Sequence, residues 1–411
     1  MKILITTQYF YPENFRINDF AFKMAMRGHE VSVLTGLPNY PRGKLFGSYK
    51  IFGSEKIKGV MVYRVPLFPR GKGRGFQLAI NYFSFMLSSL VFGPFLLRKV
   101  RPDIIFSINY SPATVGVVGV YFSMLKKAPL FLWVQDLWPD SLVATNAIRS
   151  EIILNSIDIM VRWIYRKSNL IFIQSRSFKD SIVSKRSPVS KKIRYLPNWA
   201  EDTFNEDIKF VDQIYQQLVP KNKFIIMFAG NLGVAQSLGT IVKAAIEVRD
   251  SRIHWVFLGD GRQKLWLESA ISGAGICDNV SILGRYPLKD MPKFFKLADV
   301  MIVTLKKDPA FSNTIPGKIQ SYLKNAKPIL SALDGEGASV IEESQAGLNV
   351  NSEDYISLAA AARKMSELSS EELARMSINA KNYYDKNFDV NILLSQFESE
   401  VHLESSKAKS S

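Results

Sequence analysis

The sequence of 411 residues contains one cysteine, Cys277, and only three histidines. A single cysteine excludes an intrachain disulfide and is typical of a protein from a reducing compartment. The histidines, His29, His254 and His402, fall at strand starts or near the C-terminus, so we expect a structural role for each. No Asp-x-Asp pair closes an apolar run, and Asp334-Gly-Glu336 lies in a glycine-rich turn. The sequence therefore predicts that no catalytic metal is bound.

The segment Gly75–Leu97 has no charged residue and is long enough to cross a membrane. Gly93-Pro94 is expected to break its helical pattern. Four polar residues recur at helical spacing, namely Gln77, Asn81, Ser84 and Ser88. Basic residues flank both ends, at Arg70, Lys72, Arg74, Arg98, Lys99 and Arg101. Three interpretations stay open: a helix lying in the membrane surface, a buried core helix and a true span.

The charge is divided unevenly along the chain. Residues 1–200 hold 29 Lys and Arg against 10 Asp and Glu, a net charge of +19, whereas the remainder has 24 against 27, a net charge of −3. The first half is therefore predicted to face an anionic partner, or else to have an ordinary basic surface. Nucleic acid, acidic lipid and a lipid-linked diphosphate would all fit, although no nucleic-acid recognition motif supports the first.

Short apolar runs alternate with helical patterns in both halves, which predicts βαβ units around parallel sheets. The expected strands of the first half are 2–7, 30–35, 104–108, 130–134, 170–174 and 193–196; those of the second are 224–229, 255–258, 280–283, 300–305 and 328–332. A polar, charged segment, 205–222, separates the two series. We expect an α/β protein of two doubly wound domains that face a cleft, covering 1–204 and 205–386, with 387–411 as a final helix and tail.

Phosphate chemistry is indicated where strand 300–305 leads through a loop into a short helix. Pro316 stands at the helix start, followed by Gly317 and Lys318. Free N–H groups and the positive end of the helix dipole favour an anion there, and a lysine strengthens the site. Glycine-rich turns after the two earlier strands, Gly230-Asn231-Leu232-Gly233 and Gly259-Asp260-Gly261, allow close approach of a ligand or simply make tight turns.

The ordered set of these motifs resembles the retaining glycosyltransferases of family 4, which have the GT-B fold of two Rossmann-like domains. The resemblance rests on AGNLG, VFLGDG, ILGRYP, ADVMIVTL, PGKIQSYLKNAKPIL and EESQAGLNV in the second half. In the first half, QYFYPENFRIND, LTGLPNYPRGK, VQDLWPDS and LPNWAED are similar to a bacterial O-antigen, capsule and exopolysaccharide subgroup that includes N-acetyl-L-fucosamine transferases.

The resemblance implies a UDP-sugar donor, a substrate rather than a cofactor, in the C-terminal domain. It also implies a polyprenyl-diphosphate-linked glycan acceptor in the N-terminal domain, at the cytoplasmic face of the membrane. The expected donor-binding residues are Asn231, Gly233, Arg262, Arg285, Asn313, Thr314, Gly317 and Ser321, with Lys318 assigned to catalysis. The expected acceptor-binding residues are Glu13, Asn14 and Arg16, although Asn14 capping a helix and Glu13 in a surface pair would be structural alternatives.

The chain departs from the family pattern at three places. Asn313 and Ser321 stand where most relatives have a glutamate pair, and Asn231 and Gln236 stand where many have an arginine and a lysine. The cleft histidine of many relatives is replaced by Gln135-Asp136. Asp136 is therefore the candidate to contact the reacting sugar or orient the attacking hydroxyl, or alternatively it caps the turn before Pro139.

A retaining glycosyltransferase acting on a lipid-linked glycan is the function that these patterns favour. Two alternatives stay open. A catalytically reduced partner protein would explain the missing charged pairs, and a UDP-sugar 2-epimerase would share the fold. The histidines fall in the wrong places for the epimerase.

Overall fold

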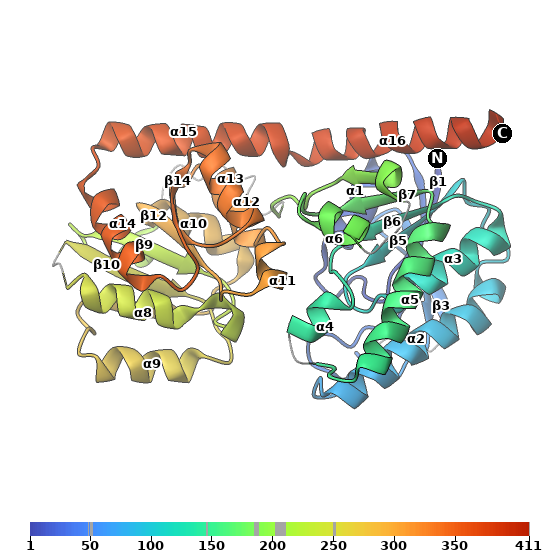
Figure 1. The fold of residues 1–411 in the computed structure, drawn as a ribbon, viewed down its shortest axis with the longest axis horizontal. Helices are drawn as coiled ribbons and strands as arrows, with labels where there is room; N and C mark the ends of the chain where they lie inside the picture. The colour runs from blue at the N-terminus through green and yellow to red at the C-terminus, as the bar shows by residue number, and fades with distance from the viewer. Residues whose placement is uncertain are drawn as a thin grey trace. The chain divides into compact units, whose positions relative to one another are not determined.

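The computed structural model describes residues 1–47, 49, 52–144, 147–184, 189–201, 211–249 and 252–410. The chain forms two compact units, Met1–Leu196 with Leu394–Ser411, and Pro197–Leu393 (Figure 1). The expected domain boundary at residues 204 and 205 lies outside the described residues. Each unit is a parallel sheet covered by helices, so the predicted α/β class is confirmed. The cleft between two domains stays a prediction.

Unit 1 holds eight strands in the order β3-β4-β2-β1-β5-β6-β7-β8. The strands are β1 (Lys2–Thr6), β2 (Glu30–Gly36), β3 (Gly53–Ile57), β4 (Val60–Val65), β5 (Ile104–Asn109), β6 (Leu130–Val134), β7 (Leu170–Ile173) and β8 (Ile193–Tyr195). The helices are α1 (Arg16–Met26), α2 (Gly75–Leu96), α3 (Thr114–Lys126), α4 (Asp140–Ala144), α5 (Glu151–Lys167), α6 (Phe178–Ser184) and most of α16 (Val390–Ser410).

The edge hairpin β3–β4 was not expected from the sequence. It is the antiparallel pair of this sheet, and its two-residue turn is Lys58-Gly59, with φ of 45° and 87°. Positive φ at both central residues is the geometry that matches the twist of a hairpin, and glycine at the second position supplies it at little cost. The Lys58-Gly59 pair between two short runs that alternate apolar and polar residues was the local signal for this hairpin.

The unit 1 sheet is buried on both faces because successive side chains alternate. One face, which includes Leu4, Ile105 and Leu132, packs against α2, α3 and α5. The opposite face is aromatic: Phe106 and Trp133 stack near Phe20 of α1, and Phe397 of α16 lies 5.0 Å from the rings of both Phe20 and Phe106. Phe397 is fully buried, so α16 is a structural part of this unit.

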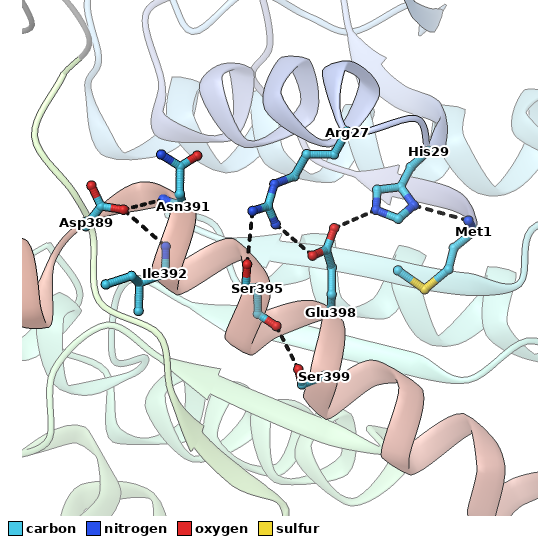
Figure 2. A network of polar contacts seen from close by, with 9 residues as sticks. All are labelled: Met1, Arg27, His29, Asp389, Asn391, Ile392, Ser395, Glu398 and Ser399. Carbon is cyan, nitrogen blue, oxygen red and sulfur yellow. Dashed lines mark hydrogen bonds and ion pairs between the residues drawn. The ribbon is translucent and has the colours of Figure 1, made fainter.

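Polar contacts also hold α16 onto unit 1, as Figure 2 shows. Glu398 accepts hydrogen bonds from Arg27 and binds His29, both at 2.7 Å, and His29 in turn contacts the N-terminal amine at 3.1 Å. Arg194 makes a further ion pair with Glu400 at 2.6 Å. The helix continues to Ser410 where a tail was expected, because no glycine or proline interrupts its last turns.

Helix α2 is the unusual element of unit 1, because its buried side carries the polar residues Asn81 and Ser89 beside the core residue Phe85. Asn81 and Ser89 are buried, and Asn81 accepts from Gln8 at 2.7 Å and donates to the Phe68 carbonyl at 2.6 Å. The expected break at Gly93-Pro94 was wrong: the helix runs to Leu96. Pro94 lies in the last turn, where it removes a single backbone hydrogen bond, and Gly93 leaves room for Phe122 of α3.

Unit 2 holds a six-stranded sheet in the order β11-β10-β9-β12-β13-β14, with every pair parallel. The strands are β9 (Phe224–Ala229), β10 (Ile253–Leu258), β11 (Val280–Gly284), β12 (Val300–Thr304), β13 (Ile329–Ala332) and β14 (Gly347–Val350). The helices are α7 (Gln213–Gln216), α8 (Leu238–Glu247), α9 (Lys264–Gly273), α10 (Met291–Leu297), α11 (Pro309–Ser312), α12 (Gly317–Lys324), α13 (Glu336–Ser344), α14 (Tyr355–Glu367) and α15 (Ser370–Asn387).

Helices cover both faces of this second sheet. Residues such as Ile226, Trp255 and Ile302 pack against α8, α9 and α14, whereas Met227 and Met301 on the other face pack against α10, α12 and α15. A doubly wound sheet of this kind places its loops at the carboxyl ends of the strands, where ligands of such folds bind.

Candidate active site

Two glycine-rich loops of unit 2 are packed backbone against backbone. Gly230 after β9 and Gly259 after β10 have φ of 139° and 150°, and a Cβ added at Gly259 would lie 1.8 Å from the Gly230 carbonyl oxygen. Leu232 N–H donates to the Asp260 carbonyl at 2.9 Å, and Gln263 N–H donates to the Leu232 carbonyl at 3.0 Å. These glycines therefore bring the carboxyl ends of β9 and β10 together, a contact that side chains would prevent.

Lys318 in the first turn of α12 points toward the same loops. Its Nζ lies 3.9 Å from the ring centroid of Phe228, at the end of β9, and donates to Oε1 of Gln236. The stem crosses Gly230, where an added Cβ would lie 2.6 Å from the lysine Cε. Because burial desolvates the ammonium group, the pKa of Lys318 is lowered to about 7.

No carboxylate is among the groups that shift the pKa of Lys318 in the described part of the chain. A desolvated cation whose acceptor is a neutral carboxamide gains strongly from a nearby anion. The N-cap of α12 is Pro316, which makes no side-chain capping bond, so the positive end of this helix adds to the attraction. The arrangement is suited to hold a phosphate group at the carboxyl edge of the unit 2 sheet.

The segment between β12 and α12 is held in place by its own turn contacts. Asp308 caps α11 by accepting from Ala310 N–H at 2.8 Å, and Thr314 Oγ1 donates to the Phe311 carbonyl at 3.0 Å. Gly335, with φ of 68°, passes so close that an added Cβ would lie 2.2 Å from the Ser312 carbonyl oxygen. A small hollow beside this segment is lined in part by Lys306, Thr314 and Asp334.

In unit 1, the carboxylate of Glu13 closes a loop. Glu13 is 3% exposed and accepts from the backbone N–H groups of Asn39 at 2.8 Å, Tyr40 at 2.6 Å and Phe10 at 3.3 Å. Burial raises its pKa, and these three hydrogen bonds oppose that rise. Glu13 is therefore buried rather than part of a surface pair, and its carboxylate orders the loop that follows β2.

Asp136 is the second residue after β6, at the carboxyl edge of the unit 1 sheet. Its Oδ2 accepts from Ser141 Oγ of α4 at 3.0 Å. Burial raises the pKa of Asp136, and the hydrogen bond from Ser141 opposes this. Asp136 is half-buried as a residue, and its carboxyl group anchors α4 through Ser141.

Two family models match the chain. The model described as "Glycosyl transferase 4-like domain" matches residues 14–199, and the one described as "Glycosyl transferases group 1" matches residues 211–383. Together they span almost all of both sheets. The chain belongs to the family 4 glycosyltransferases.

Curated relatives of this glycosyltransferase come from bacteria. It is 26% identical over 337 residues to "Putative colanic acid biosynthesis glycosyl transferase WcaI" of Escherichia coli strain K12, covering 79% of this chain and 81% of the relative. It is 25% identical over 349 residues to "Probable glycosyltransferase WbjE" of Pseudomonas aeruginosa, covering 80% of each chain.

The fold is shared with solved structures at low sequence identity. The Anabaena protein Alr3699/HepE, solved in complex with UDP, superposes with a TM-score of 0.71 at 15% identity, over 98% of this chain and all of that one. The E. coli structure named "Trehalose-6-phosphate from E. coli bound with UDP-2-fluoro glucose" superposes with a TM-score of 0.72 at 12% identity, over 98% of this chain and 99% of that one. The predicted GT-B class, with two Rossmann-like sheets, is confirmed.

Several of the donor-binding residues expected in this glycosyltransferase lie on or beside the loop from Gly230 to Gly233. Gly233 lies beside Asn231, whose Nδ2 is 2.6 Å from where a Gly233 Cβ would be, and Lys318 crosses Gly230. Arg262 and Arg285 are exposed in the loops after β10 and β11. Asn313, Thr314, Gly317 and Ser321 lie before and along α12, where Ser321 Oγ donates to the Gly317 carbonyl at 3.2 Å. Their role in binding stays a prediction.

Phe228 and Gln236 are the contacts of Lys318 that sequence reasoning did not assign. Gln236 is fixed because its carbonyl accepts from Thr304 Oγ1 of β12 and because the neighbouring Ala235 carbonyl accepts from Lys306 N–H at 3.0 Å. The available signal for Phe228 was its place near the end of β9, just before the glycine turn at Gly230. The contact between Phe228 of β9 and Lys318 of α12 forms only in the folded unit.

The residues expected to bind the acceptor lie around the start of α1. Asn14 is exposed, and Phe15 rather than Asn14 is the N-cap of α1, so the capping alternative for Asn14 was wrong. Arg16 begins α1 and lies near Tyr110, whose hydroxyl accepts from Ile17 N–H at 3.0 Å. The structure brings Arg16 and Tyr110 together at the edge of unit 1, while acceptor binding by Glu13, Asn14 and Arg16 stays a prediction.

The histidines make structural contacts where the structure describes them. His29 joins Glu398 and the N-terminus, and His254 of β10 contacts Ser281 Oγ of β11 at 2.7 Å. Burial lowers the pKa of His254. His402 is exposed on α16. Within the described ranges no group of three metal-binding side chains occurs, and a reaction without metal stays a prediction.

Proposed function

We propose that this glycosyltransferase transfers a sugar from a UDP-sugar to a lipid-linked glycan, with retention, during bacterial polysaccharide assembly. The observation that carries the donor assignment is Lys318, a desolvated lysine at the start of α12 with a carboxamide as its acceptor. Complexes of the Anabaena relative with UDP and with UDP-glucose support a UDP-linked donor. The name of WcaI, a putative colanic acid biosynthesis glycosyl transferase, supports a role in polysaccharide biosynthesis, and an amino sugar such as N-acetyl-L-fucosamine is the donor sugar proposed.

The proposed reaction relies on the charge that develops on the leaving diphosphate. Lys318 and the first-turn N–H groups of α12 would stabilise that charge in the transition state more than in the bound donor, which is the condition for acceleration. Asp136, held by Ser141, would orient the acceptor hydroxyl. In a reaction on the same face of the sugar, the departing diphosphate itself takes the proton of that hydroxyl, so no histidine is required.

The exposed side of α2 supports attachment to the inner face of the membrane. Large apolar side chains recur along one side of the helix at steps of three or four residues, and they are exposed: Phe76, Ile80, Phe83, Leu87, Val91 and Phe95. The side toward the protein combines the polar Asn81 and Ser89 with the core residue Phe85. α2 is also the one described helix long and apolar enough to span a membrane, but its buried Asn81 and Ser89 pack on the unit 1 sheet. A helix lying in the lipid surface fits best.

Basic residues stand at both ends of this apolar stripe. Lys72 and Arg74 precede α2, whereas Arg98, Lys99 and Arg101 follow it, and all five are exposed. Such residues bind anionic headgroups while the apolar side chains enter the acyl region. The proposed partners are therefore the UDP-sugar, a polyprenyl-diphosphate glycan and an anionic membrane surface, and the proposed location is the cytoplasmic face of the plasma membrane.

The proposal is tested by UDP release from a panel of UDP-sugars, with and without undecaprenyl-diphosphate-GlcNAc in detergent. We expect one donor whose UDP release is stimulated by the acceptor lipid, with the anomeric configuration of the donor kept in the product. Binding of UDP without release in any combination would instead support a catalytically reduced partner, which the missing charged pairs favour. Conversion of a UDP-sugar to its 2-epimer in the absence of lipid would establish the third possibility.

A further inference from the structure

Helix α5 carries a second exposed apolar row in unit 1, separate from that of α2. Ile152, Ile159 and Trp163 are 80%, 61% and 38% exposed, and they recur along one side of the helix at steps of about two turns and one turn. The opposite side of α5, which includes Val161 and Ile164, is buried in the core of unit 1. Large apolar side chains gathered on the outer side of a helix mark a surface that meets a partner.

The exposed rows of α5 and α2 face the same way. α2, α3 and α5 cover one face of the unit 1 sheet, and α3 contacts both of the other two helices (Figure 1). Because each helix turns its buried residues toward the sheet, the exposed rows point away from it on the same side. Met124 of α3, which is 68% exposed, lies on the outer side of the same layer. The apolar side chains of all three helices therefore belong to one surface of unit 1.

The polar residue within the α5 row already has a hydrogen bond inside the helix. Ser156 lies between Ile152 and Ile159, and its Oγ donates to the Ile152 carbonyl at 2.8 Å. A hydroxyl with such a bond enters an apolar medium at a lower cost than an unpaired one. Trp163 ends the row, and an indole, with its apolar ring and its polar N–H, suits the boundary between acyl chains and headgroups.

The charge of this layer favours an anionic lipid surface over a second copy of the chain. Residues 75–101, 114–127 and 149–167 hold nine Lys and Arg against two Asp and Glu. One of the two acids, Asp158, is half-buried and forms an ion pair with Arg162 at 3.0 Å, and the other is Glu151. Two copies of so basic a surface would repel each other, whereas anionic headgroups attract it.

We propose that α5 docks on the anionic membrane surface together with α2, with Ile152 and Ile159 in the acyl region and Trp163 at its boundary. This inference rests on the proposed function, which places α2 alone in the lipid surface. A single helix in the surface leaves unit 1 free to tilt about the helix axis, whereas two helices of one layer fix the face that lies against the lipid. The opposite face of the sheet, covered by α1 and α16, then points away from the membrane.

Quenching of tryptophan emission by brominated lipid tests the contact of α5 with the membrane. Bromine on the acyl chains quenches only an indole that approaches the lipid interior. Of the six tryptophans, two are exposed, Trp163 of α5 and Trp266 of α9, and four are buried. With vesicles of brominated phosphatidylglycerol, the emission of the wild-type protein and of Trp266→Phe should fall by the same amount. Trp163→Phe should lose most of that quenching.

A double change, Ile152→Ser with Ile159→Ser, measures what α5 contributes to binding. Both side chains are exposed, so the melting temperature should not change, whereas sedimentation with phosphatidylglycerol vesicles should show binding weakened by about tenfold. Ile356→Ser with Ile378→Ser is the matched control, because these side chains of unit 2 are 64% and 60% exposed. The control should bind vesicles as the wild-type protein does.

The outcomes separate this inference from the function on which it rests. If the wild-type protein binds vesicles but Trp163 is not quenched, or if the α5 serine variant binds as well as the wild type, then α5 does not touch the lipid, although the attachment through α2 stands. If the wild-type protein binds no vesicles, the membrane attachment fails and the inference fails with it. A wild-type dimer that becomes a monomer in the α5 serine variant, measured by ultracentrifugation without lipid, would assign this face to a second copy and overturn the inference.

Discussion

The two units are built on the same plan, yet their loops carry different chemistry. In unit 2, glycines bring two strand ends together, and a single lysine is desolvated among them. In unit 1, the strand ends carry neutral amides and a buried carboxyl group, and the charge lies elsewhere, on a strongly basic surface. The comparison indicates that a parallel sheet supplies only the position of a site, whereas the residues at the strand ends decide its chemistry.

Replacing Lys318 should have the largest effect on the donor side. Lys318→Ala is expected to reduce kcat/KM for the UDP-sugar by about 10²–10³-fold, the range for removing one preorganised donor from a developing negative charge. Steady-state UDP release measures this. Lys324→Ala is the matched control, because Lys324 lies on the same helix, with its Nζ 5.8 Å from the Tyr384 ring centroid and donating to the Glu201 carbonyl at 3.1 Å. An equal loss in both variants would contradict a specific role for Lys318.

Changing the exposed apolar side of α2 should affect unit 1 and leave the donor site of unit 2 intact. The triple change of Phe83, Leu87 and Val91 to serine is expected to weaken binding to vesicles containing phosphatidylglycerol by at least about tenfold, since buried apolar area drives such binding. UDP binding should be unchanged. Sedimentation with vesicles gives the comparison, and serine at Leu265, Ile356 and Ile378 of unit 2, which are somewhat more exposed than the α2 residues, is the control. Unaltered vesicle binding of the α2 variant would refute the membrane assignment.

The pH dependence of UDP binding sharpens the account of Lys318. Its pKa is lowered to about 7 in the free protein, and a bound diphosphate favours the charged form, which raises the pKa in the complex. UDP affinity should therefore be greatest below pH 7 and should fall by roughly tenfold between pH 7 and pH 8.5 as Lys318 of the free protein loses its proton.

Lys318→Arg supplies the control for this titration, because an arginine stays charged throughout the range. We expect its UDP affinity to be nearly constant over the same pH interval. A wild-type affinity that does not change with pH, measured by calorimetric titration, would mean that Lys318 is already fully charged or does not meet the diphosphate.

The smallest expected effect is at Ser141. Ser141→Ala removes the hydrogen bond to Asp136, so the pKa of Asp136, already raised by burial, should rise further. The acid limb of the pH–rate profile should move to higher pH, with a few-fold loss of rate near neutrality, about the value of one hydrogen bond. A lower melting temperature with an unmoved acid limb would show that Asp136 only anchors α4.

The sequence was sufficient for the α/β class, because alternating apolar runs and helical patterns mark parallel sheets. It also located Lys318 at the start of α12 after an expected strand. Elements with weaker local patterns were missed. The β3–β4 hairpin lies at a sheet edge, where no residue of β3 is fully buried, and β14 is only partly buried.

Contacts between distant segments could not be predicted from the sequence. Nothing local to Gln236 or Phe228 shows that α12 will place a lysine between them. Glu13 was expected on the acceptor side because it follows β1, whereas its three backbone partners come from two loops that meet only in the folded unit. Of the polar stripe expected on α2, only Asn81 is buried, whereas Gln77 is exposed and Ser84 and Ser88 are half-buried, so the helical spacing alone did not identify the side that faces the protein.

Amide hydrogen exchange tests most directly whether unit 2 binds the donor and unit 1 binds the acceptor. The account predicts that UDP protects unit 2 around residues 228–237, 259–263 and 313–321, and that farnesyl-diphosphate-GlcNAc protects unit 1 around residues 8–16, 109–114, 135–141 and 174–178. Protection of the unit 1 segments by UDP, with the α12 start unaffected, would contradict the assignment of the donor to Lys318 and of the acceptor to unit 1.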